Sequence, residues 1–166
     1  MVTLRAFHPD DEPRLIELAN NERVTRYLRD HFPRPYTRRD ARYWIEEGSS
    51  NALGQHFAIS LGGDCIGSTG VFWERDEYRY SGEIGYWLGE PFWGKGYATE
   101  ALGLLNTWLL ENTELQRFYA RVVDANIAST RVLEKCGYQR EGVLRRAVWK
   151  RGAFYDEHVF SLIRHS

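Results

Sequence analysis

The order of strand and helix signals along the chain predicts a mixed α+β fold, in which a central twisted mixed sheet of about six to seven strands is flanked by about four helices. Three observations support this prediction. Runs of branched and aromatic residues alternate with stretches of helical periodicity. Glycine-containing turns join neighbouring strands near the middle and near the end of the chain. A strand, a helix and another strand also follow one another in the order of a parallel crossover, in which the helix is the connection.

Length and composition predict one globular domain that spans residues 1–166. A chain of 166 residues is long enough to bury a sizeable core, and 43% hydrophobic and 27% charged residues are ordinary for such a protein. The net charge of -1 gives no general attraction to nucleic acid or to membranes. No apolar run approaches a membrane span and the N-terminus lacks a signal sequence, so a cytoplasmic protein is expected. Cys65 and Cys136 are too few for a disulfide framework.

The first part of the chain predicts one short strand followed by helices. Thr3–Phe7 has the pattern of an edge strand, and Asn20–Arg29 continues a helical pattern after a first helix. Residues that can cap helices stand at the expected starts: Asp10 or Asp11 before the first helix, and Thr37 with Asp40 in the capping-box spacing before the third.

The remainder predicts a hairpin, a strand–helix–strand–helix unit and a final hairpin. Glycines mark the turns and the end of the last helix: Gly62-Gly63, Gly137 and Arg151-Gly152. The expected strands are Gln55–Leu61, Cys65–Trp73, Glu83–Leu88, Leu115–Val123, Tyr138–Lys150 and Phe154–Ile163, and the expected helices are one from Tyr97 and one over Asn126–Cys136.

The chain is organised around the stretch from Gly82 to Leu105, where a strand leads through a glycine turn into a helix. Gly94 and Gly96 stand just before the helix. Glycines at this place let backbone N–H groups approach an anion without hindrance from a Cβ atom, and the helix dipole adds partial positive charge. The stretch therefore predicts a binding site for a phosphate or a pyrophosphate.

Two common glycine-turn chemistries fit this stretch poorly. The P-loop of nucleotide hydrolases needs Ser or Thr after Gly-Lys, but Gly96 follows Lys95 here. A dinucleotide-binding turn needs a third glycine where Thr99 stands. That fold also requires an acidic residue at the end of the next strand, and Asp124 stands there. Dinucleotide binding therefore stays open as an alternative.

A third chemistry is indicated by resemblance to a known family. Trp93–Leu102, WGKGYATEAL, resembles the acetyl-CoA-binding turn of the GNAT N-acetyltransferase superfamily, although Trp93 replaces the usual Arg or Gln. The ribosomal-protein N-terminal acetyltransferase branch, of the RimJ/RimL type, is similar there too. Further similar segments are Glu83–Leu88, Asn126–Tyr138 and Gly152–Leu162. Several motifs in the expected order are much stronger evidence than one.

This resemblance implies a GNAT-like sheet and an acetyl-CoA-dependent N-acetyltransferase that acts by direct attack of a primary amine in a ternary complex. It implies no metal, and the histidines and cysteines lack metal-ligand spacing. The backbone N–H near the end of the first of these segments would serve as an oxyanion donor. The implied acetyl-CoA-binding residues are Tyr86, Trp87, Leu88, Gly94, Lys95, Gly96, Tyr97, Ala98, Thr99, Asn126 and Ser129.

Two residues are the expected catalytic groups. Related acetyltransferases use a glutamate on this strand as the base, which points to Glu83; a surface or hairpin salt bridge is the alternative interpretation of the same residue. Many members of the superfamily protonate the sulfur with a tyrosine, but Leu133 occupies that position. The RimJ/RimL branch implies Ser129 as the acid, with Asn126 beside it. As an alternative, Asn126 only caps the helix.

The acceptor site is expected between the N-terminal helices, the loop Glu74–Tyr80 and the final hairpin. Aromatic residues available to line it are Tyr27, Phe32, Tyr36, Trp73, Tyr86 and Tyr155. The branch implies the α-amine of a protein or peptide N-terminus as acceptor. A small amine such as a polyamine or an antibiotic, or a CoA-binding module without turnover, are the alternatives. Neither nucleic acid nor a membrane is an expected partner, and a homodimer is a family-level expectation.

Overall fold

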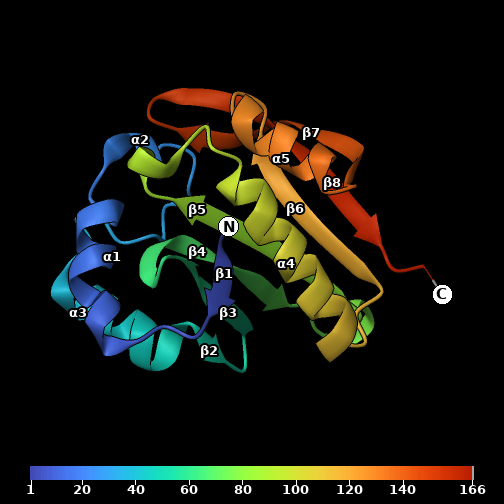
Figure 1. Ribbon diagram of the computed structural model, residues 1–166. Coiled ribbons are helices and arrows are strands. Elements are labelled where there is room, and N and C mark those ends of the chain that lie inside the picture. The colour runs from blue at the N-terminus through green and yellow to red at the C-terminus, as the bar shows by residue number, and fades with distance from the viewer. Residues whose placement is uncertain (166) are drawn as a thin grey trace.

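The computed structural model describes residues 1–165 as one mixed sheet with helices on both of its faces (Figure 1). Its strands are β1 (Thr3–Arg5), β2 (Ser50–Asn51), β3 (Gly54–Leu61), β4 (Asp64–Trp73), β5 (Ser81–Leu88), β6 (Arg117–Val123), β7 (Gln139–Lys150) and β8 (Ala153–Ile163). Its α-helices are α1 (Glu12–Ala19), α2 (Glu22–Thr25), α3 (Arg38–Tyr43), α4 (Tyr97–Asn112) and α5 (Ile127–Lys135). The predicted mixed α+β class is confirmed. The strand count reaches eight because a two-residue strand, β2, joins the edge of β3.

The sheet order is β1-β3-β4-β5-β6-β8-β7, and every neighbouring pair is antiparallel except β5 and β6. These two central strands are parallel and are connected by α4, as the sequence predicted. The two predicted hairpins are also confirmed. The turn between β7 and β8 holds Arg151 at φ 48° and Gly152 at φ 80°, the left-handed pair typical of a two-residue turn.

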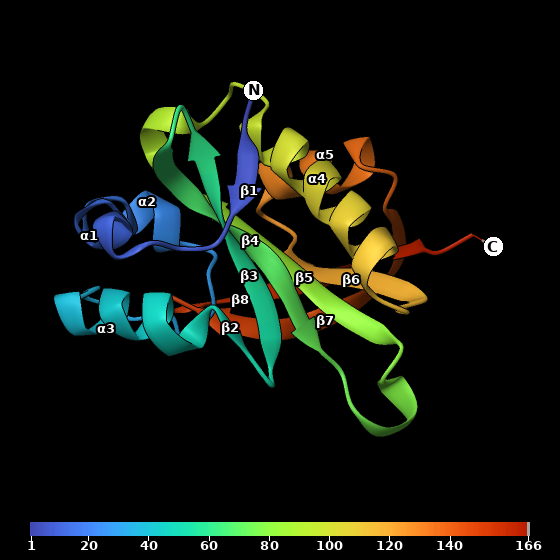
Figure 2. The same ribbon diagram turned by 60° about the horizontal axis from the view of Figure 1, so that its bottom comes forward.

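Two apolar clusters fix the helices on opposite faces of the sheet (Figures 1 and 2). Under α4 and α5, the fully buried side chains include Leu102, Leu105, Leu109, Phe118, Leu133 and Phe160. The leucines of α4 recur at helical spacing, and each contributes roughly 2 kcal/mol by leaving water. Under α1 and α3, the buried residues are Leu15, Ala19, Tyr36, Ala41, Ala58 and Cys65. The sheet thus separates the two cores.

The N-terminal helices differ from the sequence prediction in two details. Asp11 does not cap α1 with its side chain, because its carboxylate binds Arg5 and the His8 backbone N–H. The second helix ends at Thr25, well before Arg29, because the chain after α2 binds to the sheet through its side chains. The capping box of Thr37 and Asp40 at α3 is confirmed.

The parallel ladder between β5 and β6 is short, and this feature positions the site. It contains only the pairs Ser81–Arg117, Gly82–Phe118 and Glu83–Tyr119, although β5 runs on to Leu88 and β6 to Val123. Beyond Glu83 the two strands separate in the middle of the sheet. Since α4 follows β5 and α5 follows β6, the N-termini of both helices lie at the end where the strands separate.

The longest helix, α4, has 16 residues, and no helix in the described part of the chain, residues 1–165, has the length and apolarity needed to cross a membrane.

Candidate active site

The turn before α4 leaves the start of that helix open. Gly94 and Gly96 have φ of 71° and 81°, the left-handed region that favours glycine, and a Cβ atom on either would meet no atom within 4 Å. Gly96 is the N-cap of α4 and provides no side chain to bond the first-turn N–H groups of Tyr97, Ala98 and Thr99. These donors are therefore free to bind an anion. The Lys95 ammonium donates to the Pro91 carbonyl at 3.1 Å.

The start of α5 brings two hydroxyl groups together. Asn126 caps the helix, because its side-chain oxygen accepts from the Ser129 N–H at 3.3 Å. The Ser129 Oγ atom lies 2.7 Å from the Tyr86 Oη atom, and Tyr86 also donates to the Ser129 carbonyl at 3.1 Å. Burial raises the pKa of the Tyr86 phenol well above its usual value, and the bond with Ser129 offsets this only in part, so the phenol is neutral.

A phenol reaches α5 from β5, that of Tyr86. Leu133, at the position of the usual tyrosine, is fully buried in the core under α4 and α5. The sequence indicated a missing proton donor there. It did not indicate that a strand tyrosine would reach the same helix from the other side of the strand gap.

Strand β5 presents different groups to the two faces of the sheet, since successive side chains of a strand alternate. Ile84, Tyr86 and Leu88 point toward α4 and α5, and we call this the α4–α5 face. Glu83 and Trp87 point the other way, toward α1, α3 and the segment that joins α2 to α3, and we call this the α1–α3 face.

On the α1–α3 face, Glu83 sits at the last pair of the parallel ladder, directly opposite Tyr119. Its side chain is 17% exposed and is ion-paired with the guanidinium of Arg29. Burial raises the pKa of the Glu83 carboxyl, and the positive charges of Arg29 and Arg121 hold back that rise. The negative charges of Glu74 and Glu157 raise it further.

Tyr119, the strand partner of Glu83, also contacts the loop before β5. Its hydroxyl donates to the carboxylate of Glu74, and the guanidinium groups of Arg117 and Arg121 lie over its ring at 5.4 and 5.9 Å. Burial and the bond with Glu74 raise the pKa of Tyr119 to about 12. Sequence reasoning missed Arg29, Tyr119 and Arg121. The only available signal was the alternation of β6, which places Tyr119 and Arg121 on one face.

Trp93, which replaces the usual Arg or Gln of the superfamily pattern, fixes the end of β5. The indole N–H of Trp93 donates to the Leu88 carbonyl at 2.9 Å and so attaches the strand end to the turn. Trp87 packs on the α1–α3 face, edge-on to Phe32 with ring centroids 5.9 Å apart.

The aromatic residues expected around the acceptor do not form one group. Tyr36 is buried in the core under α1 and α3, Trp73 packs against the core under α4 and α5, and Tyr86 faces Ser129. Phe32 stacks on Tyr36 at 5.4 Å. Phe32 also packs edge-on to Trp87, so it lies between Tyr36 and Trp87.

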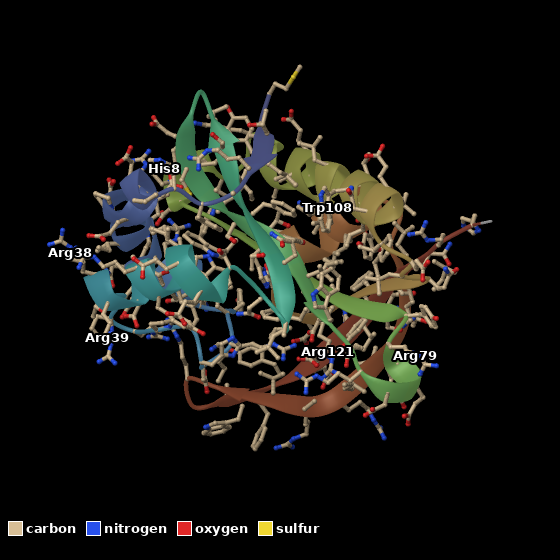
Figure 3. All side chains as sticks on the ribbon, turned by 90° about the horizontal axis from the view of Figure 1, so that it is seen from below. His8, Arg38, Arg39, Arg79, Trp108 and Arg121 are labelled. Atoms are coloured by element: carbon tan, nitrogen blue, oxygen red, sulfur yellow. The ribbon has the colours of Figure 1, made fainter. Side chains whose placement is uncertain are left out.

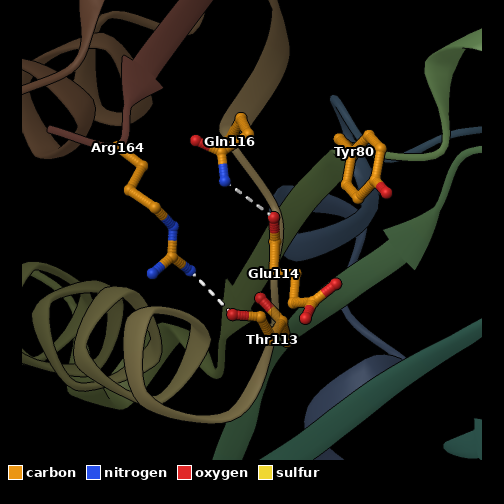
Figure 4. Close-up of a pocket in the computed structure, with 5 residues that line it drawn as sticks. All are labelled: Tyr80, Thr113, Glu114, Gln116 and Arg164. Carbon is orange, nitrogen blue, oxygen red and sulfur yellow. Dashed lines mark hydrogen bonds between the residues drawn. The ribbon is translucent and has the colours of Figure 1, made fainter. Parts of the chain in front are cut away.

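A hollow at the far end of α4 contains none of these groups (Figure 4). It is lined by Tyr80, Thr113, Glu114, Gln116 and Arg164. The Arg164 guanidinium donates to the carbonyls of Leu109, Leu110, Thr113 and Leu115. These are carbonyls at and after the helix C-terminus, where a cation is stabilising, so the hollow is a by-product of helix capping.

His56 and Cys65 are buried, and Cys136 is partly buried. Burial lowers the pKa of His56 to about 4, between the rings of Trp44 and Phe72. Burial raises the pKa of Cys65 to about 11 and that of Cys136 in the same direction, so both are thiols. Within residues 1–165, no group of three His, Cys, Asp or Glu side chains is arranged to hold a metal ion.

Comparison with known proteins identifies the family. Residues 1–139 match the acetyltransferase (GNAT) domain. The SPbeta prophage-derived uncharacterized N-acetyltransferase YokL of Bacillus subtilis (strain 168) is 30% identical over 165 residues, which cover 98% of this chain and 90% of YokL.

Solved structures share the fold at lower identity. The structure of RimL, a ribosomal L7/L12 alpha-N-protein acetyltransferase in complex with coenzyme A, has a TM-score of 0.85 at 22% identity and covers 98% of this chain and 93% of its own. Spermidine N-acetyltransferase from Vibrio cholerae, in complex with CoA and spermine, has a TM-score of 0.82 at 21% identity and covers 98% and 95%. Since these two proteins have different acceptors, the fold does not decide the acceptor. The family match and the relative aligned over nearly the whole chain show that this chain belongs to the GNAT family and is an N-acetyltransferase.

Proposed function

We propose that this chain transfers the acetyl group of acetyl-CoA to a primary amine by direct attack of the amine on the thioester in a ternary complex, with residues 1–166 forming one catalytic domain. The observation that carries the proposal is the interrupted ladder between β5 and β6. The strands separate at the place where the uncapped N-terminus of α4 and the Asn126-capped N-terminus of α5 lie on one face of the sheet, and the half-buried Glu83 carboxylate lies on the other. GNAT acetyltransferases take their acetyl group from acetyl-CoA.

The donor is proposed to bind on the α4–α5 face. The N–H groups of Gly94 to Thr99 hold the pyrophosphate, and Lys95 adds a positive charge close by. The open space around Gly94 and Gly96 supports this assignment, since backbone donors bind phosphate only where no side chain intervenes. Asn126, Ser129 and the end of β5 from Tyr86 to Leu88 flank the pantetheine arm.

The amine is proposed to react from the α1–α3 face. Glu83 accepts the proton of the acceptor ammonium, directly or through a water molecule, and the free amine then attacks the thioester carbon to form the C–N bond. The tetrahedral intermediate collapses as the C–S bond breaks and the nitrogen loses its second proton. Burial supports this role, because it raises the pKa of the carboxyl toward the range in which a base works near neutral pH.

The leaving thiolate is proposed to take its proton from Ser129. Ser129 recovers a proton from the phenol of Tyr86, whose oxygen is 2.7 Å away. The phenol regains, through water, the second proton that the acceptor nitrogen loses as the amide forms, so no phenolate persists. A backbone N–H near Leu88 stabilises the oxyanion of the tetrahedral intermediate. This assignment makes Tyr86 part of the proton path as well as of the donor site.

The acceptor is proposed to be the α-amine of a peptide or protein N-terminus, as in the RimJ/RimL branch. The sequence motifs of that branch support it, together with the structural likeness to RimL. A small-amine acetyltransferase is the second candidate. The likeness to spermidine N-acetyltransferase supports it, but only at the level of the fold.

The test is release of CoA thiol when the purified chain meets acetyl-CoA and a panel of N-terminal peptides and polyamines. We expect thiol release that depends on the amine and is lost in Glu83→Gln. Binding of CoA without turnover by any amine would show a binding module instead. Protection from thermal unfolding by NAD and not by CoA would favour a dinucleotide site.

A further inference from the structure

The Glu83 carboxylate, which we propose as the base, is already ion-paired with a guanidinium group of the same chain. Arg29, from the segment after α2, places its guanidinium on the Glu83 carboxylate. The two partners differ in exposure, since the side chain of Arg29 is 53% exposed and that of Glu83 is 17% exposed. An acceptor ammonium that is to meet Glu83 must therefore displace or share this guanidinium, which approaches from the solvent side.

Arg29 is held in this position by its neighbours. Asp30 is ion-paired with Lys150 at 2.9 Å, and the Lys150 side chain is only 8% exposed. Arg151, in the turn after β7, donates to the Glu22 carbonyl of α2 at 3.3 Å. The tip of the β7–β8 hairpin accordingly lies beside α2 (Figure 1). The segment that carries Arg29 is fastened to this hairpin, so the arginine belongs to the wall of the site.

A second arginine reaches the same place from the sheet. Arg121 lies on β6 two residues beyond Tyr119, the strand partner of Glu83, and so on the same face. Its charge acts on both Glu83 and Glu157. Figure 3, in which the molecule is seen from below, shows Arg121 between the central strands and the β7–β8 hairpin, far from Arg39 on α3.

The two walls of this site are rich in positive charge although the whole chain has a net charge of -1. Residues 26–34, the segment after α2 that carries Arg29, hold three arginines and one acidic residue, Asp30. Residues 139–152 hold four arginines and one lysine against a single Glu141. Walls of this sign attract an acceptor with a negative charge and repel one with additional positive charges.

We propose that the acceptor is a primary amine that carries a carboxylate a few bonds from its nitrogen. Binding exchanges ion pairs: the acceptor ammonium takes Glu83, and the acceptor carboxylate takes the guanidinium groups of Arg29 and Arg121. A simple cationic amine would displace Arg29 and leave it without a partner, whereas this exchange keeps every charge paired. The planar guanidinium fork suits a carboxylate. The proposal rests on the proposed function of Glu83.

A peptide with an acidic second residue and a free amino acid both present this chemistry, and the experiment separates them. The acceptors are three amidated tetrapeptides, Ser-Glu-Gly-Tyr, Ser-Gln-Gly-Tyr and Ser-Lys-Gly-Tyr, together with free serine and spermidine. The measurement is kcat/KM from thiol release at fixed acetyl-CoA. We expect the glutamate peptide to exceed the glutamine peptide by roughly tenfold, the value of one charge-assisted hydrogen bond, and the lysine peptide to be the poorest.

Variants assign the preference to the two arginines. Arg29→Gln and Arg121→Gln should each lower the glutamate-to-glutamine ratio toward one. Arg39→Gln removes the same charge from an exposed site on α3 and should leave the ratio as it is. All three arginines are exposed, so these changes do not threaten the fold.

The outcomes separate this inference from the proposed function. Spermidine or the lysine peptide used as well as the glutamate peptide, or a ratio unchanged in both glutamine variants, would overturn the inference and leave the acetyltransfer reaction standing. Free serine as the best acceptor would support it, with the α-carboxylate as the anionic group. No thiol release with any amine would overturn both.

Discussion

The two faces of strand β5 are assembled from the chain in different ways. On the α4–α5 face, the groups assigned to the donor come from the end of β5 and from two short stretches, Gly94–Thr99 and Asn126–Ser129, each of which follows closely on a strand of the parallel pair. On the α1–α3 face, Glu83 meets Arg29, which is 54 residues away in the sequence. The neighbour of that arginine, Asp30, is held by Lys150, 120 residues further along.

This difference indicates what each face can control. Backbone donors at a helix start recognise a phosphate whatever the acceptor is, because the local conformation alone places them. Charged side chains gathered from distant segments can change without disturbing the fold, so they are the groups that we expect to select the acceptor. Changes on the α4–α5 face should therefore affect every acceptor alike, while changes on the α1–α3 face should alter the choice among acceptors or the base itself.

The largest effect is expected for Glu83→Gln. The amide keeps the shape of the side chain but cannot take a proton, and loss of a general base costs about a hundredfold or more in kcat. Steady-state thiol release with the best acceptor measures this, and binding of CoA, followed by thermal shift, should be unaffected because the group lies on the other face. Full turnover by this variant would show that Glu83 serves only as the partner of Arg29.

A smaller loss is expected when the hydroxyl pair on the α4–α5 face is broken. Ser129→Ala and Tyr86→Phe should each reduce kcat by about tenfold with every acceptor. The loss is smaller than for Glu83→Gln because a thiolate can leave without being fully protonated, whereas the ammonium must lose its proton before it can attack. The double variant should lose little more than either single one, because the two groups act in one path. Thr130→Ala, one residue along α5, is the control. Additive losses would contradict the shared path.

Sequence reasoning recovers the α4–α5 face far better than the α1–α3 face, and the reason is physical. The glycine turn, the Asn126 cap and the Gly137 helix end depend on a few adjacent residues, so local rules place them. The Glu83–Arg29 ion pair and the Tyr86–Ser129 contact depend on how separate elements pack. The helix expected to reach Arg29 stops at Thr25, since contacts with the sheet override local helical preference in this segment.

A change of intermediate size tests the backbone of the donor turn. In Gly96→Ala the added Cβ disfavours the left-handed φ of 81°, at a cost of roughly 1 to 2 kcal/mol. The first-turn N–H groups should then lose alignment, and KM for acetyl-CoA should rise up to about tenfold with no change in the ranking of acceptors. Gly103→Ala is the matched control, since it lies within α4 and its Cβ would meet no atom within 4 Å. An unchanged KM in Gly96→Ala would show that the turn does not hold the donor.

The smallest effect is expected in the pH dependence of Arg29→Gln. Burial raises the pKa of Glu83, and the positive charges of Arg29 and Arg121 oppose the rise, while Glu74 and Glu157 add to it. Removing the charge of Arg29 therefore lets the pKa of Glu83 rise further. Because a protonated carboxyl cannot act as a base, the acidic limb of kcat/KM should move to higher pH, while the rate at the alkaline side is little changed. Profiles of the wild type, Arg29→Gln and Arg39→Gln measure this, and the last should coincide with the wild type. A limb that moves to lower pH, or does not move, would mean that a group other than Glu83 sets it, and the α1–α3 face would then select the acceptor without providing the base.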